Sequence, residues 1–312
     1  MKKATIKKLT ITGIICLACI IVVLICDICV TNNAKGRIYN DVESLPHQKV
    51  GLILGTSPDS TWNGKRNHNF DVTRGLHPDV KESIVRDFTK VNADVLSVSH
   101  IETKYGDLIC LKPDLNGLKV DMVCGEIPSP ENGSIILAFA GAFTGTEFDK
   151  GHANVAGDHV VGGVRFKGYR CKRNTGAFIW SAKSGPQFFY KDYSLALDRA
   201  AKEGGMGFAQ EMMIHNGQKV PTTRPLGNKN VFRALCLDSD NHLVLYESQG
   251  IVTFGNFIDA LLSQGVKEAL YTDMGQGWNY CFYRVNQSEK TPRYLHSTSL
   301  PYASNFIVIK TK

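Results

Sequence analysis

The sequence lacks the patterns that identify nucleic-acid-binding proteins. It contains no long run of Lys or Arg and no aromatic residues interleaved with basic ones, although the formal net charge is +7. Much of that charge comes from Lys2, Lys3, Lys7 and Lys8, and the other basic residues are scattered among acids. Nucleic acid is therefore not an expected partner.

Three catalytic motifs are also missing. The chain has no Gly-x-Ser-x-Gly, no Gly-Lys-Ser/Thr and no His-Glu-x-x-His sequence. These motifs would indicate a serine hydrolase, a nucleoside-triphosphate enzyme and a zinc protease, respectively. The chain has no internal repeat and no low-complexity segment, and its 43% hydrophobic and 21% charged residues are typical of a globular protein with a sizeable core.

The nine cysteines do not form a recognisable metal site. Four of them make two Cys-x-x-Cys spacings within residues 16–29, but no histidine or further cysteine completes either pair. The other five are dispersed beyond residue 100, and an odd number permits at most two disulfides. We expect most of these five to be buried apolar side chains, and we predict neither a metal nor an organic cofactor.

Residues 9–30 are almost wholly apolar, and Asp27 interrupts the run near its end. About 20 apolar residues suffice to span a bilayer. Because lysines precede the segment, the positive-inside rule makes residues 1–8 a cytoplasmic tail and sends the rest outward. We predict a transmembrane signal anchor at 9–30 that holds the protein in the membrane with an extracytoplasmic, cell-envelope location. Cleavage or lipidation is the alternative.

Residues 31–78 are predicted to be a spacer that contains one orphan strand. The strand is the apolar run from Lys49 to Leu54, which leads into a Gly-Thr-Ser turn. With the apolar segment before it, this region resembles the start of the envelope protein family associated with vancomycin exclusion, over about residues 9–70. The helix and parallel strands that such a domain needs do not follow, and one strand cannot make a sheet. We assign this segment no activity.

Residues 79–312 carry both helix and strand patterns and are predicted to form the main domain. Apolar side chains recur at helical spacing in 79–91 and 254–264, and 194–203 is a helix ended by two glycines. Strands are expected at 94–100, 107–111, 118–124, 134–140, 178–180, 187–190, 206–215, 232–237, 242–247, 266–271 and 305–310. The predicted fold class is α/β, a mixed β-sheet with flanking helices, preceded by one transmembrane helix.

Asp273 is the first candidate for a functional residue. It follows the strand at 266–271 and stands beside Gly275 and Gly277. A carboxylate in this position is fixed by the strand, while the glycine-containing loop gives a ligand access to it. The alternative is that Asp273 only stabilises its own turn.

Four segments, in this order, resemble the phosphodiester glycosidase domain family over about residues 93–312. They are Ala140-Gly141-Ala142-Phe143 after an apolar strand, Gln210 to Gly217, Arg233 to Asp238, and the helix 254–264 followed by Thr272-Asp273-Met274-Gly275. The resemblance implies hydrolysis of a sugar–phosphate diester in an envelope or extracellular glycan. Ala140 stands where the family often has Asn, and Met274 and Gln276 interrupt its glycine run. These departures favour the alternative, a non-catalytic, membrane-anchored glycan-binding or envelope-barrier protein.

The implied chemistry needs two kinds of side chain. The phosphate that leaves carries negative charge, which the fixed donors of a guanidinium suit, and positive charge develops on the sugar ring, which a carboxylate suits. On this reasoning Arg233 binds the phosphate and Asp273 acts at the sugar. The expected partner is a phosphorylated glycan or a sugar-1-phosphodiester. Because strands alternate, Arg233 can equally face the solvent.

Two more residues are candidates for catalysis. Glu147 follows a turn of small residues and is a candidate second carboxylate, a cation ligand together with Asp149, or part of a solvated loop. His215 shares a predicted strand with Gln210 and Glu211, and alternation puts Glu211 and His215 on the same face. That face is either a wall of the site or the wet face of a hairpin.

The remaining candidates would bind substrate. Gly141 and Gly275 allow backbone to approach it closely, together with Gln210 and Glu211. His152 and His159 are candidates for contacting the phosphate or donating a proton, although single histidines are more often structural or exposed. Trp278 is placed to stack on a sugar ring or to complete the core.

Overall fold

The computed structural model describes residues 95–144, 152–274, 280–296 and 305–312. The predicted tail, anchor, spacer strand and helix at 79–91 lie outside these ranges. In the described part of the chain, no helix has both the length and the apolar character needed to cross a bilayer. The elements described below all belong to the second of the two compact units of the chain, Lys49–Lys312.

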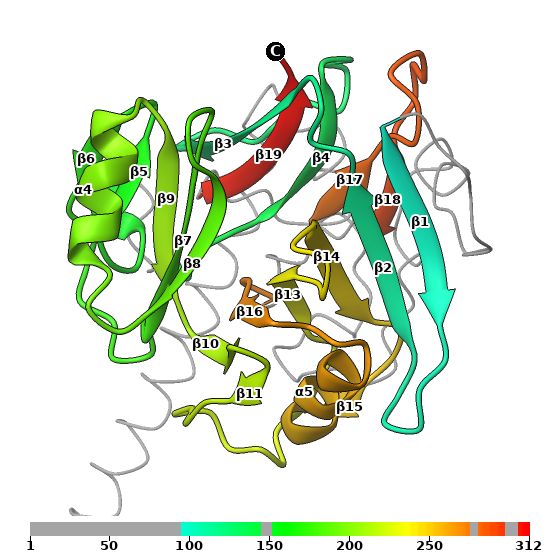
Figure 1. Cartoon of the computed structure of the whole chain (residues 1–312). Helices are drawn as coiled ribbons and strands as arrows, with labels where there is room; N and C mark the ends of the chain where they lie inside the picture. The colour runs from blue at the N-terminus through cyan, green and yellow to red at the C-terminus, as the bar shows by residue number, and fades with distance from the viewer. Residues whose placement is uncertain (1–94, 145–151, 275–279, 297–304) are drawn as a thin grey trace, which may run out of the picture. The chain divides into compact units, whose positions relative to one another are not determined.

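The first sheet has seven strands (Figure 1). In spatial order they are β1 (Leu96–Ile101), β2 (Leu108–Pro113), β14 (Leu243–Ser248), β13 (Arg233–Leu237), β16 (Glu268–Tyr271), β10 (Met212–His215) and β11 (Gln218–Lys219). β10 and β11 join through Asn216-Gly217, and both residues have positive φ, 53° and 71°. This is the Asn-Gly hairpin that the sequence predicts.

The second and third sheets have five strands each. The second runs β18 (Arg293–His296), β17 (Cys281–Tyr283), β4 (Ile135–Ala140), β19 (Asn305–Thr311) and β3 (Leu118–Cys124). The third runs β6 (Val164–Phe166), β5 (His159–Val161), β9 (Met206–Gln210), β7 (Gly176–Ser181) and β8 (Gly185–Tyr190). A separate ribbon pairs β12 (Lys229–Asn230) with β15 (Val252–Thr253).

The predicted fold class, α/β with flanking helices, is wrong. The described residues form mainly β-structure, and only two α-helices accompany their sheets. All strand pairs in these sheets are antiparallel. Antiparallel neighbours such as β1 and β2 or β13 and β14 need only a short turn between them, whereas parallel strands need a long crossover, usually helical.

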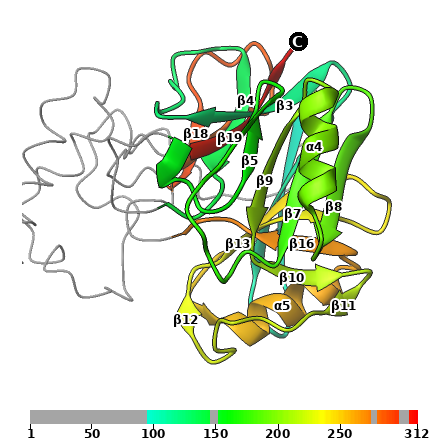
Figure 2. The same ribbon diagram turned by 90° about the vertical axis from the view of Figure 1, so that its left-hand side faces the viewer.

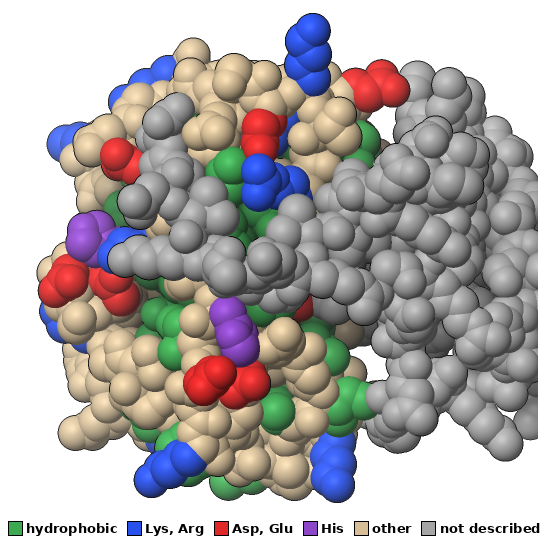
Figure 3. Space-filling model, turned by 90° about the vertical axis from the view of Figure 1, so that its right-hand side faces the viewer, with side chains coloured by type: hydrophobic (Ala, Val, Ile, Leu, Met, Phe, Trp, Pro, Cys, Tyr) green, Lys and Arg blue, Asp and Glu red, His purple; other side chains and the backbone are tan. Residues whose placement is uncertain are grey.

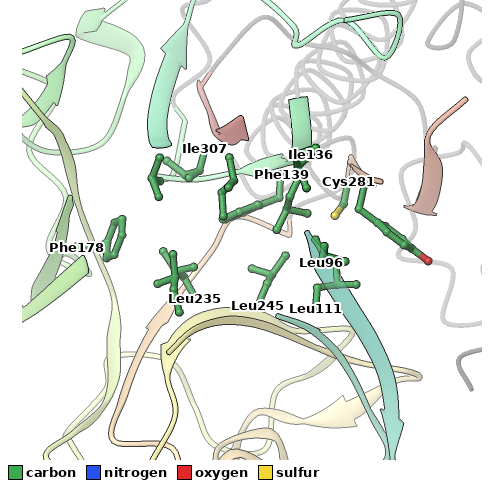
Figure 4. Close-up of a cluster of buried hydrophobic side chains, with 14 of the residues drawn as sticks. Leu96, Leu111, Ile136, Phe139, Phe178, Leu235, Leu245, Cys281 and Ile307 are labelled. Atoms are coloured by element: carbon green, nitrogen blue, oxygen red, sulfur yellow. The ribbon is translucent and has the colours of Figure 1, made fainter. Parts of the chain in front are cut away.

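One apolar core lies among the three sheets. Leu235 and Leu245 reach it from the first sheet, Phe139 and Ile307 from the second, and Phe178 from the third. Figure 4 shows these side chains pointing toward one another from their separate strands. Because each sheet gives one face to this core, strand ends from different sheets come close together at its edge.

The two α-helices cover outer faces of the sheets, and both are predicted from the sequence. α4 (Ser194–Lys202) buries Leu197 and Ala200 against the third sheet, and α5 (Phe254–Ser263) buries Phe257 and Leu261 against the first. Figures 1 and 2 show α4 outside β9 and α5 below β13 and β16. α5 therefore supports the strand that leads to Asp273.

The start of α5 carries a side-chain cap. Thr253 Oγ1 accepts a hydrogen bond from the backbone N–H of Asn256 at 3.1 Å. A Thr253→Ala variant should lose about 1 kcal/mol of unfolding free energy in chemical denaturation, because that N–H loses its acceptor. Thr253→Ser, which keeps the hydroxyl, should stay near wild type. Equal losses in the two variants would contradict the capping role.

The predicted strand 206–215 is divided in two. β9 ends at Gln210 in the third sheet, and β10 begins at Met212 in the first. Glu211 stands between them, fully buried. The chain thus passes from one sheet to another at Glu211, and the simple alternation expected between Glu211 and His215 does not continue through this point.

Candidate functional site

Asp273 lies where ends of strands from two sheets meet. Its strand, β16, ends at Tyr271 in the first sheet, and β4 of the second sheet ends at Ala140. The backbone N–H of Asp273 donates a hydrogen bond to the carbonyl of Gly141 at 2.9 Å. Asp273 is 6% exposed. The structure therefore brings together two residues that the sequence puts forward separately, Asp273 and Gly141.

The turn at Gly141 is held by Asn305, the first residue of β19. Asn305 Oδ1 accepts from the N–H of Ala142 at 2.7 Å, and Asn305 Nδ2 donates to the carbonyl of Ala142 at 3.0 Å. A Cβ on Gly141 would lie 2.9 Å from Ile307 Cδ1 and 3.0 Å from Asn305 Oδ1. A larger residue at position 141 would therefore displace the side chains of Ile307 and Asn305 on β19.

Gln210 and Glu211 join the same place from the third sheet. Gln210 Nε2 donates to the carbonyl of Gly141 at 3.5 Å, and Gln210 Oε1 accepts from the N–H of Glu211 at 2.8 Å. The carbonyl of Glu211 accepts from the N–H of Tyr271 at 2.9 Å. Both side chains are fully buried. All three sheets thus contribute backbone to one cluster around Asp273.

Arg224 completes the cluster, and the sequence gives no signal for it. It lies before Pro225 in a loop without strand or helix pattern. Its backbone N–H and its Nε donate to the carboxylate of Glu211 at 3.3 and 3.4 Å. Its guanidinium carbon lies 4.4 Å from the ring centroid of Tyr271. Arg224 neutralises the buried Glu211, so the cluster contains a compensated charge pair beside Asp273.

The negative charge of Asp273 contributes to raising the pKa of two nearby tyrosines. Burial raises the pKa of Tyr271 to about 12; Asp273 and Glu211 add to this shift, and Arg224 opposes it. Burial and the nearby Cys171 and Asp273 raise the pKa of Tyr169 to about 12 as well. Both hydroxyls therefore keep their protons at neutral pH and remain able to donate hydrogen bonds.

Arg233 is fully buried in β13, which is the neighbour of β16, the strand that leads to Asp273. Its Nε and Nη2 lie 2.8 and 2.6 Å from Glu247 Oε2, and Glu247 is its cross-strand neighbour on β14. Its carbonyl accepts from the N–H of Thr272 at 3.1 Å. Arg233 thus borders the cluster through its backbone, while its guanidinium is bound to Glu247. Its role as a phosphate ligand stays a prediction.

The candidate histidines have other partners. His215 Nδ1 lies 2.9 Å from Glu268 Oε2, and the carboxylate of Glu268 also accepts from the N–H of Asn216. His152 Nδ1 lies 2.9 Å from Nε2 of His159. Glu211 instead binds Arg224, so Glu211 and His215 do not share a contact that would make them one wall.

Four candidate residues fall outside the described ranges. They are Glu147, Asp149, Gly275 and Trp278. Their proposed roles as second carboxylate, cation ligand, backbone contact and stacking platform stay predictions.

A basic groove of about 760 Å³ adjoins the cluster. Tyr169 lines it, and so does Thr175, whose N–H donates to the carbonyl of Gln210 at 3.1 Å. The groove is also lined by Arg165, Arg170, Lys172, Lys191, Asp158 and Asp192. Arg165 is bound by Asp158 and Asp198, whereas Arg170, Lys172 and Lys191 form no ion pair with any residue that the structure describes. The groove therefore favours an anionic ligand.

Charges are distributed differently on the face drawn in Figure 3. There, basic, acidic and histidine side chains of the described residues are interspersed. A second hollow of about 540 Å³, lined by Lys112, Asp114 and His242 among others, contains none of the predicted site residues. Of these two hollows, the groove beside Tyr169 is the one that adjoins the Asp273 cluster.

Comparison with known proteins gives a fold but no sequence family. No family model and no curated protein matches the chain. The catalytic domain of zebrafish N-acetylglucosamine-1-phosphodiester α-N-acetylglucosaminidase, auto-inhibited by its pro-peptide, matches with a TM-score of 0.50 and 14% sequence identity, over 71% of this chain and 85% of that one. A hypothetical protein from Synechocystis matches with a TM-score of 0.43 and 11% identity, over 70% and 62%. The first match shows a distant fold relationship with that catalytic domain.

Proposed function

We propose that this protein hydrolyses a sugar-1-phosphodiester, with Asp273 acting at the anomeric carbon. The observation that carries the proposal is the position of Asp273, whose backbone is bonded to Gly141 and whose neighbours come from three sheets. The distant fold relationship with a phosphodiester glycosidase supports it. With the predicted signal anchor, the substrate would be an envelope or extracellular glycan.

The reaction breaks the bond between the anomeric carbon and the phosphate oxygen. The phosphate monoester leaves with the bonding electrons, and water supplies a hydroxyl to the sugar and a proton to the medium. Asp273 stabilises the positive charge on the ring or forms the bond to it. Phosphate is a good leaving group, so strong proton donation to it is not required.

The phosphate itself is assigned to the basic groove. Glu247 already binds the guanidinium of Arg233 inside the protein, whereas Arg170 and Lys172 line the groove and have no described carboxylate partner. Tyr169 connects the two parts, since it lines the groove and its pKa responds to Asp273. A diester that reaches from the groove to Asp273 would place its phosphate among these cations.

The direct test incubates the full chain with sugar-1-phosphodiesters, UDP-N-acetylglucosamine included, and measures free reducing sugar. Release of sugar supports the hydrolase. Saturable binding of the same compounds without release would instead identify a glycan-binding module. Neither binding nor release across this panel would overturn the proposal.

The groove assignment predicts a charge effect on substrate binding. An Arg170→Ala/Lys172→Ala variant should raise KM for the diester several-fold and flatten its dependence on ionic strength, because two cations that attract the phosphate are gone. The measurement is steady-state kinetics at low and high salt. Lys183→Ala/Lys202→Ala, which removes two exposed lysines outside the groove, is the matched control. A KM that changes equally in both variants would sink the assignment.

A further inference from the structure

Three potential metal ligands meet where β3 of the second sheet contacts β5 of the third. Cys124 ends β3 of the second sheet, His159 begins β5 of the third, and His152 lies in the short turn before β5. One ligand atom from each of them lies within 4.8 Å of the other two. They are separated by 28 and 7 residues in the sequence, so no motif spacing announces them.

The histidine rings are already oriented for coordination. His159 Nδ1 lies 3.1 Å from the carbonyl of Gly157, which can only accept, so Nδ1 carries the proton and Nε2 presents a lone pair. A backbone carbonyl behind the ring is the usual arrangement for a metal-bound histidine. His152 stacks on Phe166 with ring centroids 3.5 Å apart and 2° between the planes. Phe166 thereby fixes the second ring.

Burial raises the pKa of Cys124 to about 12, so without an ion this thiol stays protonated. A bound cation is what would convert it to the thiolate.

We propose that Cys124, His152 and His159 bind one Zn²⁺ ion, or another divalent transition metal of similar softness. Two imidazole nitrogens and one thiolate are a zinc donor set, and three protein ligands leave the fourth tetrahedral position to water or a small ligand. On binding, Cys124 releases one proton to solvent. The proton on His152 Nδ1, shared with His159 in the metal-free protein, moves to Nε2, so the imidazoles keep their charge.

The bound ion would stabilise the turn that contacts Asp273, because it would link the segments on both sides of that turn. Cys124 is the cross-strand partner of Asn305, whose side chain holds Ala142 and bonds to Thr144. On the other side, Val155, three residues after His152 in the sequence, forms a β-bridge with Thr144. A metal ion bound to both Cys124 and His152 would therefore link the two segments, at Asn305 and at Val155, that hold the turn in contact with Asp273. The three ligands are positioning residues in this role.

A second cluster, Asp238, Asp240 and His242, carries no such inference. The carboxylate of Asp238 accepts from the N–H groups of Asp240 and His242 and from Lys112 Nζ, so the cluster is accounted for as a β-turn with an ion pair. It serves as an internal comparator.

The test titrates the metal-stripped full chain with Co²⁺, which reports its ligands spectroscopically. We expect one Co²⁺ per chain, tetrahedral visible bands, a near-ultraviolet thiolate-to-cobalt band, and displacement of all of them by Zn²⁺. Cys124→Ser should abolish the thiolate band and weaken Zn²⁺ binding by roughly 100-fold or more, since loss of a residue that only supports a ligand already costs about 10–100-fold, and His152→Ala should weaken it comparably. His152 and Cys124 are only half-buried, so both variants are expected to fold.

Two variants are matched controls. Cys171→Ser removes another half-buried free thiol, and His242→Ala removes the histidine of the comparator cluster. Both should bind Co²⁺ as the wild type does. Absence of the thiolate band in the wild type, its survival in Cys124→Ser, or its loss in either control would overturn the proposal. None of these readouts depends on sugar release.

Discussion

An Asp273→Asn variant is expected to fold normally and to release sugar about 1000-fold more slowly than the wild type, a loss of the size expected when a group that stabilises transition-state charge is removed. The amide has nearly the shape of the carboxylate, and the Asp273 N–H that bonds to Gly141 belongs to the backbone. What the substitution removes is the negative charge opposite the developing positive charge on the sugar. The measurement is turnover of a sugar-1-phosphodiester at saturating substrate.

The comparison needs a second aspartate and a binding measurement. Asp114, exposed on the turn after β2, gives the matched control Asp114→Asn, which should leave turnover unchanged. The Asp273→Asn protein should still bind the diester, because the groove cations are intact. Undiminished turnover in a folded Asp273→Asn variant would remove Asp273 from the mechanism. Loss of binding together with turnover would point to a role in ground-state binding.

Most of the longer strands were predictable from sequence, as was the pairing of strands joined by a short turn, whereas the short strands β17 and β18 and the pairing of distant segments were not. The turn and alternation patterns predict 232–237 and 242–247 as a hairpin, and β13 and β14 pair with Arg233 opposite Glu247. Pairing of β2 with β14, or of β4 with β19, joins segments more than 100 residues apart, and no local pattern encodes it. A continuous run of apolar residues such as β4 is typical of a central strand in a parallel sheet. Here it is buried because both faces of an antiparallel sheet are covered.

Four of the candidate site residues are neighbours in the structure. Strand position and the family resemblance put forward Asp273, Gly141, Gln210 and Glu211, and the structure brings these four together, while their functional roles stay predictions. Arg224 could not be predicted as a site residue from the sequence, because it lies in an irregular loop and its importance depends on its contact with the carboxylate of Glu211. The direction of a strand residue such as Arg233 is equally inaccessible, since alternation leaves two faces to choose between.

An Arg233→Met variant should be destabilised by about 3–5 kcal/mol, because Glu247 would keep its buried charge without the guanidinium that binds it. In thermal unfolding this corresponds to a fall in Tm of roughly 6–20 °C for a domain of this size. The double variant Arg233→Met/Glu247→Leu removes both charges and replaces them with apolar side chains. It should recover most of the stability, since such replacements of buried pairs are often neutral or better.

The double variant also decides between two roles for Arg233. If the guanidinium only neutralises Glu247, the double variant should be stable and keep most of its turnover, because Arg170 and Lys172 still attract the phosphate. If Arg233 itself contacts the phosphate, the same stable protein should lose turnover by orders of magnitude. A stable but inactive double variant would therefore identify Arg233 as a phosphate ligand. A double variant as unstable as Arg233→Met would show that the pair supports the fold through contacts that apolar residues cannot replace.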